Sequence, residues 1–80
     1  MKKYDIILVN DENNSFTDVI AALVGICQHN PYQAEQCAMF VHKLGEYTIK
    51  NNIVLDDAIQ YKDLLTQVGL NIEMKQTCNN

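Results

Sequence analysis

The chain has 80 residues, of which 48% are hydrophobic and 20% charged, and its formal net charge is −4. This composition is typical of a globular protein. The chain is too short for a second core, so we expect one small domain. Six lysines, no arginine and ten acids argue against binding to nucleic acid or to an acidic membrane surface. No apolar stretch approaches the roughly 18 residues that a membrane span needs, so we expect a cytoplasmic protein.

The first half of the chain predicts a strand followed by two helices. Residues 4–9, Tyr-Asp-Ile-Ile-Leu-Val, are apolar and β-branched and predict a strand, which a polar loop ends. Ser15 is a candidate N-cap for an amphipathic helix over 15–28, in which apolar residues recur at helical spacing. Asn30 and Pro31 predict the start of a second helix over 31–44, and Gly45 predicts its end.

The second half predicts a strand, a helix and a strand. Residues 46–50 alternate weakly and predict a short strand, and Asn51-Asn52 predicts a turn. Apolar residues at spacings of three and four predict a helix over 53–68, which Gly69 closes. The alternation in 70–74 predicts a last strand with one buried face.

The order β-α-α-β-α-β predicts an α+β fold. We expect a small single-domain sandwich, in which three helices cover one face of a three-stranded antiparallel sheet. Residues 1–80 then form one domain with a core over about 4–74, and 75–80 are expected to form a flexible tail.

The sequence offers no catalytic or metal-binding motif. The glycines are isolated, so no phosphate-binding loop is expected, and His29 and His42 fit no zinc motif. No cysteine has a histidine at a helical or turn spacing that predicts a catalytic pair. Cys27 and Cys37 lie among apolar residues and are expected to be buried. We therefore expect neither an enzyme nor a cofactor.

Two polar features carry alternative interpretations. Asn10-Asp11-Glu12 follows the first strand directly and predicts either a recognition edge or a turn that only caps the next helix. His42 lies beside apolar Val41 on the second predicted helix, where a histidine is either a ligand-binding residue or a structural one. Residue chemistry alone does not choose between these alternatives.

A set of residues in the first half of the chain resembles the ClpS family. The set comprises Ile7-Leu8-Val9-Asn10-Asp11, Phe16, Val19, Ala34, Val41-His42 and Gly45. The resemblance runs without a gap over 4–45 and is looser beyond Gly45, where the chain is several residues shorter before the third helix. Members of this family are adaptors that hand N-degron substrates, which are marked by their first residue, to a Clp-type AAA+ unfoldase and its protease.

The resemblance implies a site for the first residue of a substrate peptide. Its free α-amine would bind at Asn10, Asp11 and His42, which we expect to converge on one small surface cavity. Its side chain would enter an apolar pocket beside a loop that contains Glu12 and Asn14. The expected walls of that pocket are Phe16, Val19, Ala38, Val41, Leu70, and Ile7 or nearby strand residues. The implied partners are the N-terminal peptide of a substrate and the unfoldase.

Five positions depart from the family's pattern. Glu12 stands where Asp is usual, and Asn14 and Ser15 stand where Thr and Pro are often found. Phe16 stands at a gate position that is usually Met, and Ala38 stands where Met or another larger residue is common. A bulkier gate and a smaller wall change the shape of the pocket, and with it the first-residue preference. They also favour an alternative function, that of a ClpS-fold interaction module that docks on an AAA+ or other partner without binding N-degrons.

Overall fold

The computed structural model describes residues 2–77 and confirms the predicted order of elements. The elements are β1 (Lys3–Val9), α1 (Phe16–Gly25), α2 (Pro31–Leu44), β2 (Glu46–Val54), α3 (Leu55–Gln67) and β3 (Asn71–Gln76). The α+β class predicted from this order is therefore confirmed.

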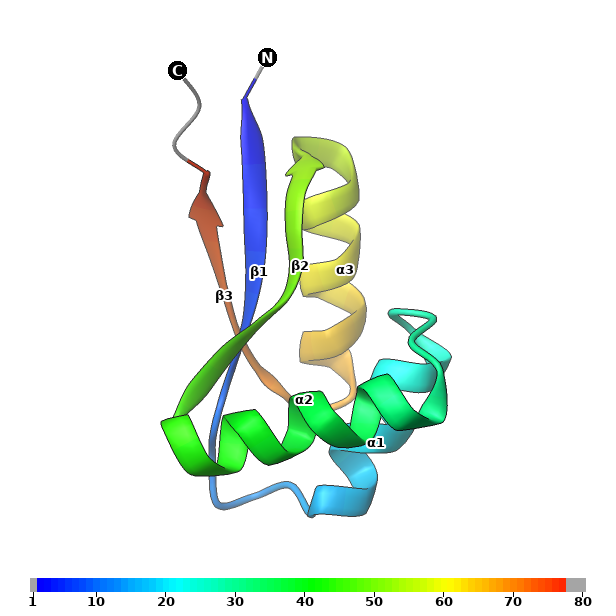
Figure 1. Cartoon of the computed structure of the whole chain (residues 1–80). Coiled ribbons are helices and arrows are strands. Elements are labelled where there is room, and N and C mark those ends of the chain that lie inside the picture. The colour runs from blue at the N-terminus through cyan, green and yellow to red at the C-terminus, as the bar shows by residue number, and fades with distance from the viewer. Residues whose placement is uncertain (1, 78–80) are drawn as a thin grey trace.

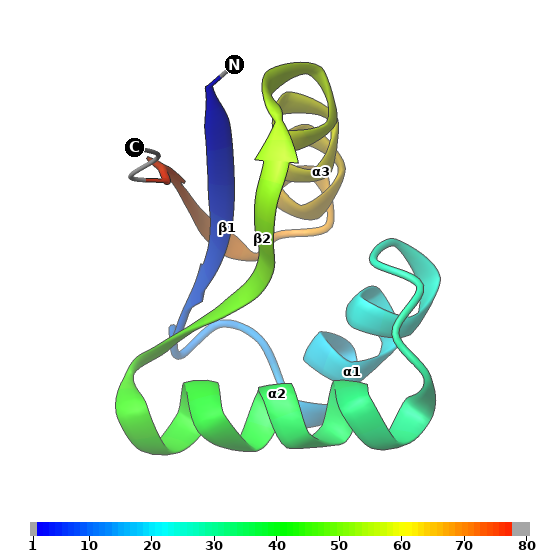
Figure 2. The same ribbon diagram turned by 45° about the horizontal axis from the view of Figure 1, so that its top comes forward.

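The three strands form one antiparallel sheet with β1 in the middle. β1 pairs with β2 on one side and with β3 on the other. Figures 1 and 2 show α3 running along the sheet, while α1 and α2 lie together across its end. This arrangement places the loop that leaves β1 beside both α1 and α2.

The core lies between the sheet and the helices. Ile6 and Leu8 of β1 are almost fully buried, as the apolar pattern of this strand predicts. They pack with buried residues from every other element: Leu23, Cys27, Ala34, Val41, Ile49, Ala58, Leu65, Leu70 and Ile72.

The bounds of α2 match those predicted, because both of its ends have strong local signals. The Asn30 side chain accepts a hydrogen bond from the Gln33 N–H at 2.8 Å, and the Gln33 side chain accepts one from the Asn30 N–H at 3.2 Å. These two bonds form a capping box, with Pro31 in the first turn. Gly45 ends the helix with φ +89°, a left-handed conformation that glycine adopts without strain.

Helix α1 ends at Gly25, three residues before the predicted end at Gln28. Gln28 has φ +60°, and the His29 N–H donates to the Leu23 carbonyl at 3.2 Å. The chain therefore leaves the helical path to reach α2, although its apolar pattern continues through Cys27.

Strand β2 continues through Val54, so the predicted turn at Asn51-Asn52 is wrong. The pairing register between β1 and β2 shifts twice, and one of the shifts leaves Asn51 and Asn52 without β1 partners. Asn52 has φ +56°, and its N–H donates to the Asp5 carboxylate at 3.0 Å. The two asparagines form a bulge within the strand. Helix α3 accordingly begins at Leu55 rather than at residue 53.

Strand β3 is longer than predicted. Lys75 and Gln76, which were expected in a flexible tail, pair with Asp5 and Tyr4 of β1. Beyond them, the Thr77 N–H donates to the Lys3 carbonyl at 2.8 Å. The expected tail residues 78–80 lie outside the described part of the chain.

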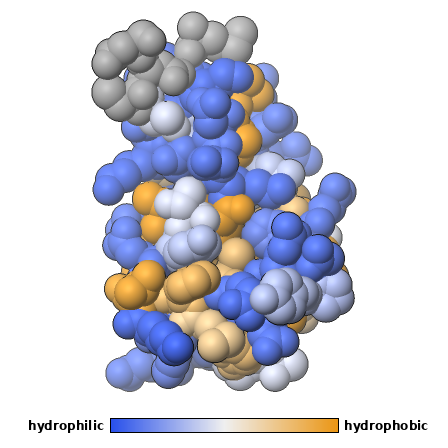
Figure 3. All heavy atoms as spheres, viewed as in Figure 1, coloured by the Kyte–Doolittle hydropathy of each residue, from blue (hydrophilic) through white to orange (hydrophobic). Residues whose placement is uncertain are grey.

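The corner between α2 and β2 is apolar. Phe40 of α2 and Tyr47 of β2 stack with their ring centroids 4.9 Å apart, and Leu44 beside them is 66% exposed. On the face seen in Figure 3, hydrophobic side chains gather in the lower half of the molecule. The contact between the two rings fastens α2 to the start of β2.

Candidate functional site

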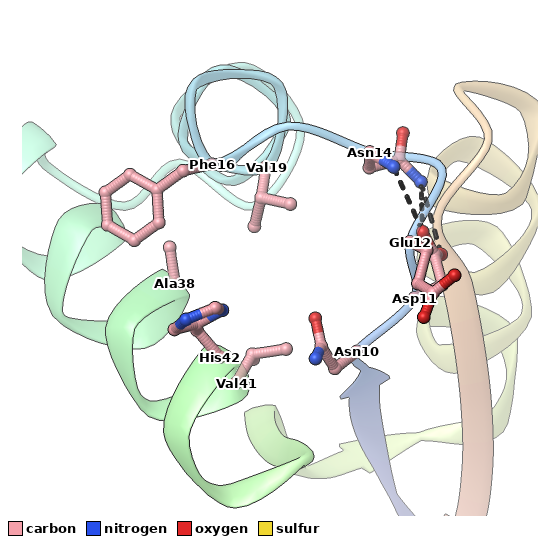
Figure 4. A pocket seen from close by; sticks show the side chains of 9 residues that line it. All are labelled: Asn10, Asp11, Glu12, Asn14, Phe16, Val19, Ala38, Val41 and His42. Atoms are coloured by element: carbon pink, nitrogen blue, oxygen red, sulfur yellow. Dashed lines mark hydrogen bonds between the residues drawn. The ribbon is translucent and has the colours of Figure 1, made fainter.

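A surface cavity of about 660 Å³ lies where the loop after β1 meets α1 and α2. Figure 4 shows Asn10, Val41 and His42 along one side of this cavity and Phe16 and Val19 across from them. The nine lining residues are Asn10, Asp11, Glu12, Asn14, Phe16, Val19, Ala38, Val41 and His42. The expected convergence of Asn10, Asp11 and His42 on one cavity is present.

A backbone hydrogen bond places Asn10 beside the C-terminal end of α2. The Asn10 N–H donates to the Gly45 carbonyl at 2.8 Å, while the Gly45 N–H closes the helix on the Val41 carbonyl at 2.9 Å. The exposed Asn10 side chain is thereby held at the cavity next to the last turn of α2.

Three residues of α2 face the cavity, because Val41 and His42 follow Ala38 by three and four positions. Ala38, Val41 and His42 lie on one side of the helix, as this spacing requires. Ala38 and Val41 are only 3% and 4% exposed, whereas the His42 ring is exposed. The helix therefore supplies an apolar floor and an accessible imidazole.

The first turn of α1 supplies the opposite apolar wall. The Ser15 hydroxyl accepts a hydrogen bond from the Asp18 N–H at 3.1 Å, which fixes the start of the helix. Phe16 and Val19 follow one turn apart, and Phe16 remains 44% exposed at the cavity. Four apolar side chains thus lie across from the polar loop, rather than forming an entirely apolar pocket (Figure 4).

The Asp11 carboxylate folds its own loop. Its Oδ1 accepts hydrogen bonds from the N–H groups of Asn13 and Asn14, at 2.9 and 3.1 Å, and from the Asn14 carboxamide at 3.1 Å. Its Oδ2 accepts a further bond from the same carboxamide at 3.2 Å. A carboxylate expected to face a ligand is therefore already bonded within the loop, while its negative charge stays at the cavity.

Leu70 lies beneath the cavity. It is 5% exposed and lines a small space of about 20 Å³ under the loop, together with Leu8 and Val9 of β1. This space adjoins the main cavity, because Asn10, Asp11, Asn14, Val19 and Val41 line both. Ile7 lines neither space, because its side chain points to the opposite face of β1 from that of Leu8. Of the expected strand residues, Leu8 and Val9 rather than Ile7 thus lie next to the site, and the role of Leu70 as a pocket wall stays a prediction.

Sequence reasoning also missed the role of backbone groups. The Asn14 carboxamide donates to the Gly69 carbonyl at 2.7 Å, although 55 positions separate the two residues. The carbonyls of Gly45 and Gly69 thus hold the two ends of the loop. The signal available in the sequence was the position of each glycine at a predicted helix end, but it did not reveal the partner.

One cysteine and one histidine lie together outside the cavity, although their spacing predicted no pair. The Cys37 sulfur is 4.0 Å from His29 Nδ1. Burial raises the pKa of the Cys37 thiol, and burial followed by the nearby Lys50 charge lowers the pKa of His29. Both shifts favour the neutral forms, which is the opposite of an activated thiolate–imidazolium pair.

The described residues contain neither a metal-binding cluster nor a membrane-spanning helix. Among residues 2–77, no group of three or more His, Cys, Asp or Glu side chains has the arrangement to hold a metal ion. In the same part of the chain, no helix combines the length and the apolar character needed to cross a membrane.

The fold is that of a small α+β domain with a surface cavity where β1, α1 and α2 meet, and sequence comparison identifies its family. The family model for the ATP-dependent Clp protease adaptor protein ClpS matches residues 1–74. The chain belongs to the ClpS family, whose members are adaptors rather than proteases. The resemblance noted in its first half is confirmed and extends through β1–α3 into β3.

Solved structures contain the same fold. One of them, the structure of Agrobacterium tumefaciens ClpS2 bound to L-phenylalaninamide, matches with a TM-score of 0.77 over 95% of this chain and 98% of that chain. The two sequences are 18% identical, so this likeness shows the shared fold alone. No curated protein matches this chain.

Proposed function

We propose that this protein is an N-degron adaptor that binds the free first residue of a substrate and delivers the substrate to a Clp-type AAA+ unfoldase. One observation carries the proposal: a single cavity has Asn10 and His42 on one side, acidic residues in its loop, and an apolar wall. Membership of the ClpS family supports the same assignment.

The polar side of the cavity suits a protonated α-amine. Such an amine ordinarily has a pKa of about 7.7–8.0 and offers three hydrogen-bond donors. The Asn10 carbonyl oxygen and a neutral His42 ring nitrogen are acceptors, and Asp11 and Glu12 add negative charge beside them. In this proposal, Asn10 and His42 bind the amine directly, and Asp11 acts through its charge.

The apolar side suits the first side chain of the substrate. Phe16, Val19, Ala38 and Val41 form a surface on which a large apolar group can leave water, a transfer worth about 1.5–3 kcal/mol. The ligand in the ClpS2 structure, L-phenylalaninamide, combines a free α-amine with an aromatic side chain. The same two groups are those that this cavity is proposed to bind.

Peptide titration tests the proposal. Fluorescent peptides that begin with Leu, Phe, Tyr or Trp should bind, and acetylation of the α-amine should weaken binding at least about tenfold, because it removes donors and leaves acceptors unpaired. His42→Ala should weaken binding of the free peptides. Lys43→Ala is the matched control, since Lys43 is exposed on the next position of α2 and does not line the cavity.

Two further results decide between this function and the alternative. Equal binding of free and acetylated peptides would overturn the proposal in favour of a ClpS-fold interaction module. Delivery is measured as degradation of a Phe-initiated reporter by a purified Clp-type unfoldase and protease, with and without this chain.

A further inference from the structure

We infer that Asn14 is a positioning residue for peptide binding, and that it acts by joining the Asp11 carboxylate to the Gly69 carbonyl. This inference rests on the proposed function, because its consequence is the affinity for a free N-terminal residue. Asn14 lines the cavity at the loop end, beyond the residues proposed to contact the amine (Figure 4).

Among the side-chain hydrogen bonds of residues 2–77, only that of the Asn14 carboxamide connects the loop after β1 to the end of α3. Its Nδ2 donates to Asp11 Oδ1 and Oδ2 at 3.1 and 3.2 Å, and to the Gly69 carbonyl at 2.7 Å. The backbone N–H of Asn14 adds a further bond to Asp11 Oδ1 at 3.1 Å. A single planar amide group therefore donates hydrogen bonds to a carboxylate on one side and to a backbone carbonyl on the other.

The Gly69 carbonyl is a fixed attachment point. Gly69 has φ +91° and closes α3, with its N–H donating to the Thr66 carbonyl at 2.9 Å. Leu70, the next residue, is buried and donates its N–H to the Leu65 carbonyl at 3.1 Å. The group to which Asn14 is bonded is thus held by both the helix end and the core.

The bond between Asn14 and Gly69 also affects Asn10, which lies at the other end of the same loop. Asn10 is bonded to the Gly45 carbonyl at one end of the segment, and Asn14 is bonded to the Gly69 carbonyl at the other. With both ends held, residues 11–13 have one conformation, and the Asn10 side chain stays directed at the cavity. A site arranged before binding avoids the entropy cost of ordering the loop in the complex.

Substitution of Asn14 separates this role from overall stability. Asn14→Ala removes the carboxamide and should weaken binding of a Phe-initiated peptide about tenfold. Asn14→Asp has nearly the same shape but places a carboxylate against Asp11 and the Gly69 carbonyl. Its loss of peptide affinity should therefore be larger than that of Asn14→Ala. Asn13→Ala is the matched control, because only the backbone of Asn13 bonds to Asp11 among the contacts of residues 2–77, and its affinity should be unchanged.

Amide hydrogen exchange supplies a readout that does not depend on the ligand. In Asn14→Ala, the N–H groups of residues 13 and 14 should exchange faster than in the native chain, while those of Ile6 and Leu8 in the core should be unchanged. If peptide affinity and loop protection both survive the substitution while the native chain distinguishes free from acetylated peptide, the inference is wrong and the proposed function stands.

The remaining outcomes are also decisive. A native chain that does not distinguish the two peptides overturns the proposed function, and with it the role of Asn14 in binding, whatever the exchange rates show. Faster exchange throughout the core of Asn14→Ala would assign Asn14 a general structural role and overturn the inference. Weaker binding with a faster-exchanging loop and an unchanged core supports it.

Discussion

The backbone N–H of Asn10 and the carbonyl of Gly45 are 2.8 Å apart, so the end of the central strand is bonded to the end of the helix that carries His42. The two residues are far apart in the sequence, yet each marks the end of its own element. The proposed amine site therefore depends on where β1 and α2 stop, as well as on which side chains they carry.

Gly45→Ala should lower the free energy of unfolding by about 1–2 kcal/mol. A Cβ at this position would meet no atom within 4 Å, so the cost arises from the left-handed backbone alone. Gly25→Ala is the control, because Gly25 lies in α1 with equally open space and an ordinary helical conformation, and it should stabilise the protein by about 0.5–1 kcal/mol. Urea unfolding measures both, and equal effects of the same sign would contradict the argument.

Ala38→Met should change which first residues bind best. The side chain of Ala38 is 3% exposed and faces the cavity, so a longer side chain there takes up space available to the ligand. We expect relative affinities for Leu-, Phe- and Tyr-initiated peptides to shift by about 1–2 kcal/mol. Ala21→Met, at an exposed position of α1 away from this cavity, is the control. An unaltered order and spread of affinities in the Ala38 variant would rule out this residue as a wall.

Asp5 should make stability depend on pH in the acid range. The Thr77 hydroxyl, at 2.7 Å, and then the Asn52 N–H, at 3.0 Å, donate to its carboxylate and lower its pKa from the ordinary 3.8. Because the folded-state pKa lies below the unfolded one, this stabilisation is fully present above the unfolded value. It is lost as the pH falls through the folded-state value.

Thr77→Val removes the larger cause of this shift. The free energy of unfolding at pH 7 should fall by about 0.5–1 kcal/mol, since the bond is only partly buried and water screens it. The difference between the variant and the native chain should vanish at a pH below both values. Thr48→Val, at an exposed position of β2, serves as the comparison. A difference that stays constant from pH 7 to 2 would show that Asp5 is not the partner that matters.

Cys27 should be unreactive in the folded protein. Burial raises the pKa of its thiol to about 11, and the residue is 0% exposed. Because the thiolate is the reactive form, a maleimide at pH 8 should label Cys37 before Cys27 in the native state, and both rapidly in denaturant. Peptide mass spectrometry resolves the two sites. Equal native labelling rates would show that the core opens around Cys27.

The sequence predicts an element well where the signals for its ends are local. Helix α2 is bounded by Asn30, Pro31 and Gly45, and all three act within one turn of the helix they delimit. The Asn51-Asn52 pair has the composition of a turn, but its conformation depends on Asp5, which lies on another strand. The residues that neighbour Asn52 in the sequence do not include Asp5, so a local pattern cannot predict this hydrogen bond.

In the candidate site, too, some residues are placed by local signals and others by contacts with distant segments. Ala38, Val41 and His42 come together because helical spacing puts them on one face, and the capped start of α1 places Phe16 and Val19. The position of Leu70 beneath the cavity and the bond from Asn14 to Gly69 depend on how α3 and β3 pack under the loop. Such contacts between distant segments are set by tertiary structure, which residue spacing does not encode.

The irregular pairing of β2 also affects how this molecule meets copies of itself. Within residues 2–77, β2 pairs only with β1, so its outer side is an open edge of the sheet. A straight, open edge is a template for edge-to-edge aggregation, and bulges are one way in which natural proteins discourage it. The two register shifts in β2 interrupt the regular row of backbone donors and acceptors that a second chain would need. The irregular β2 edge is thus a poor template for pairing with a strand of a second chain.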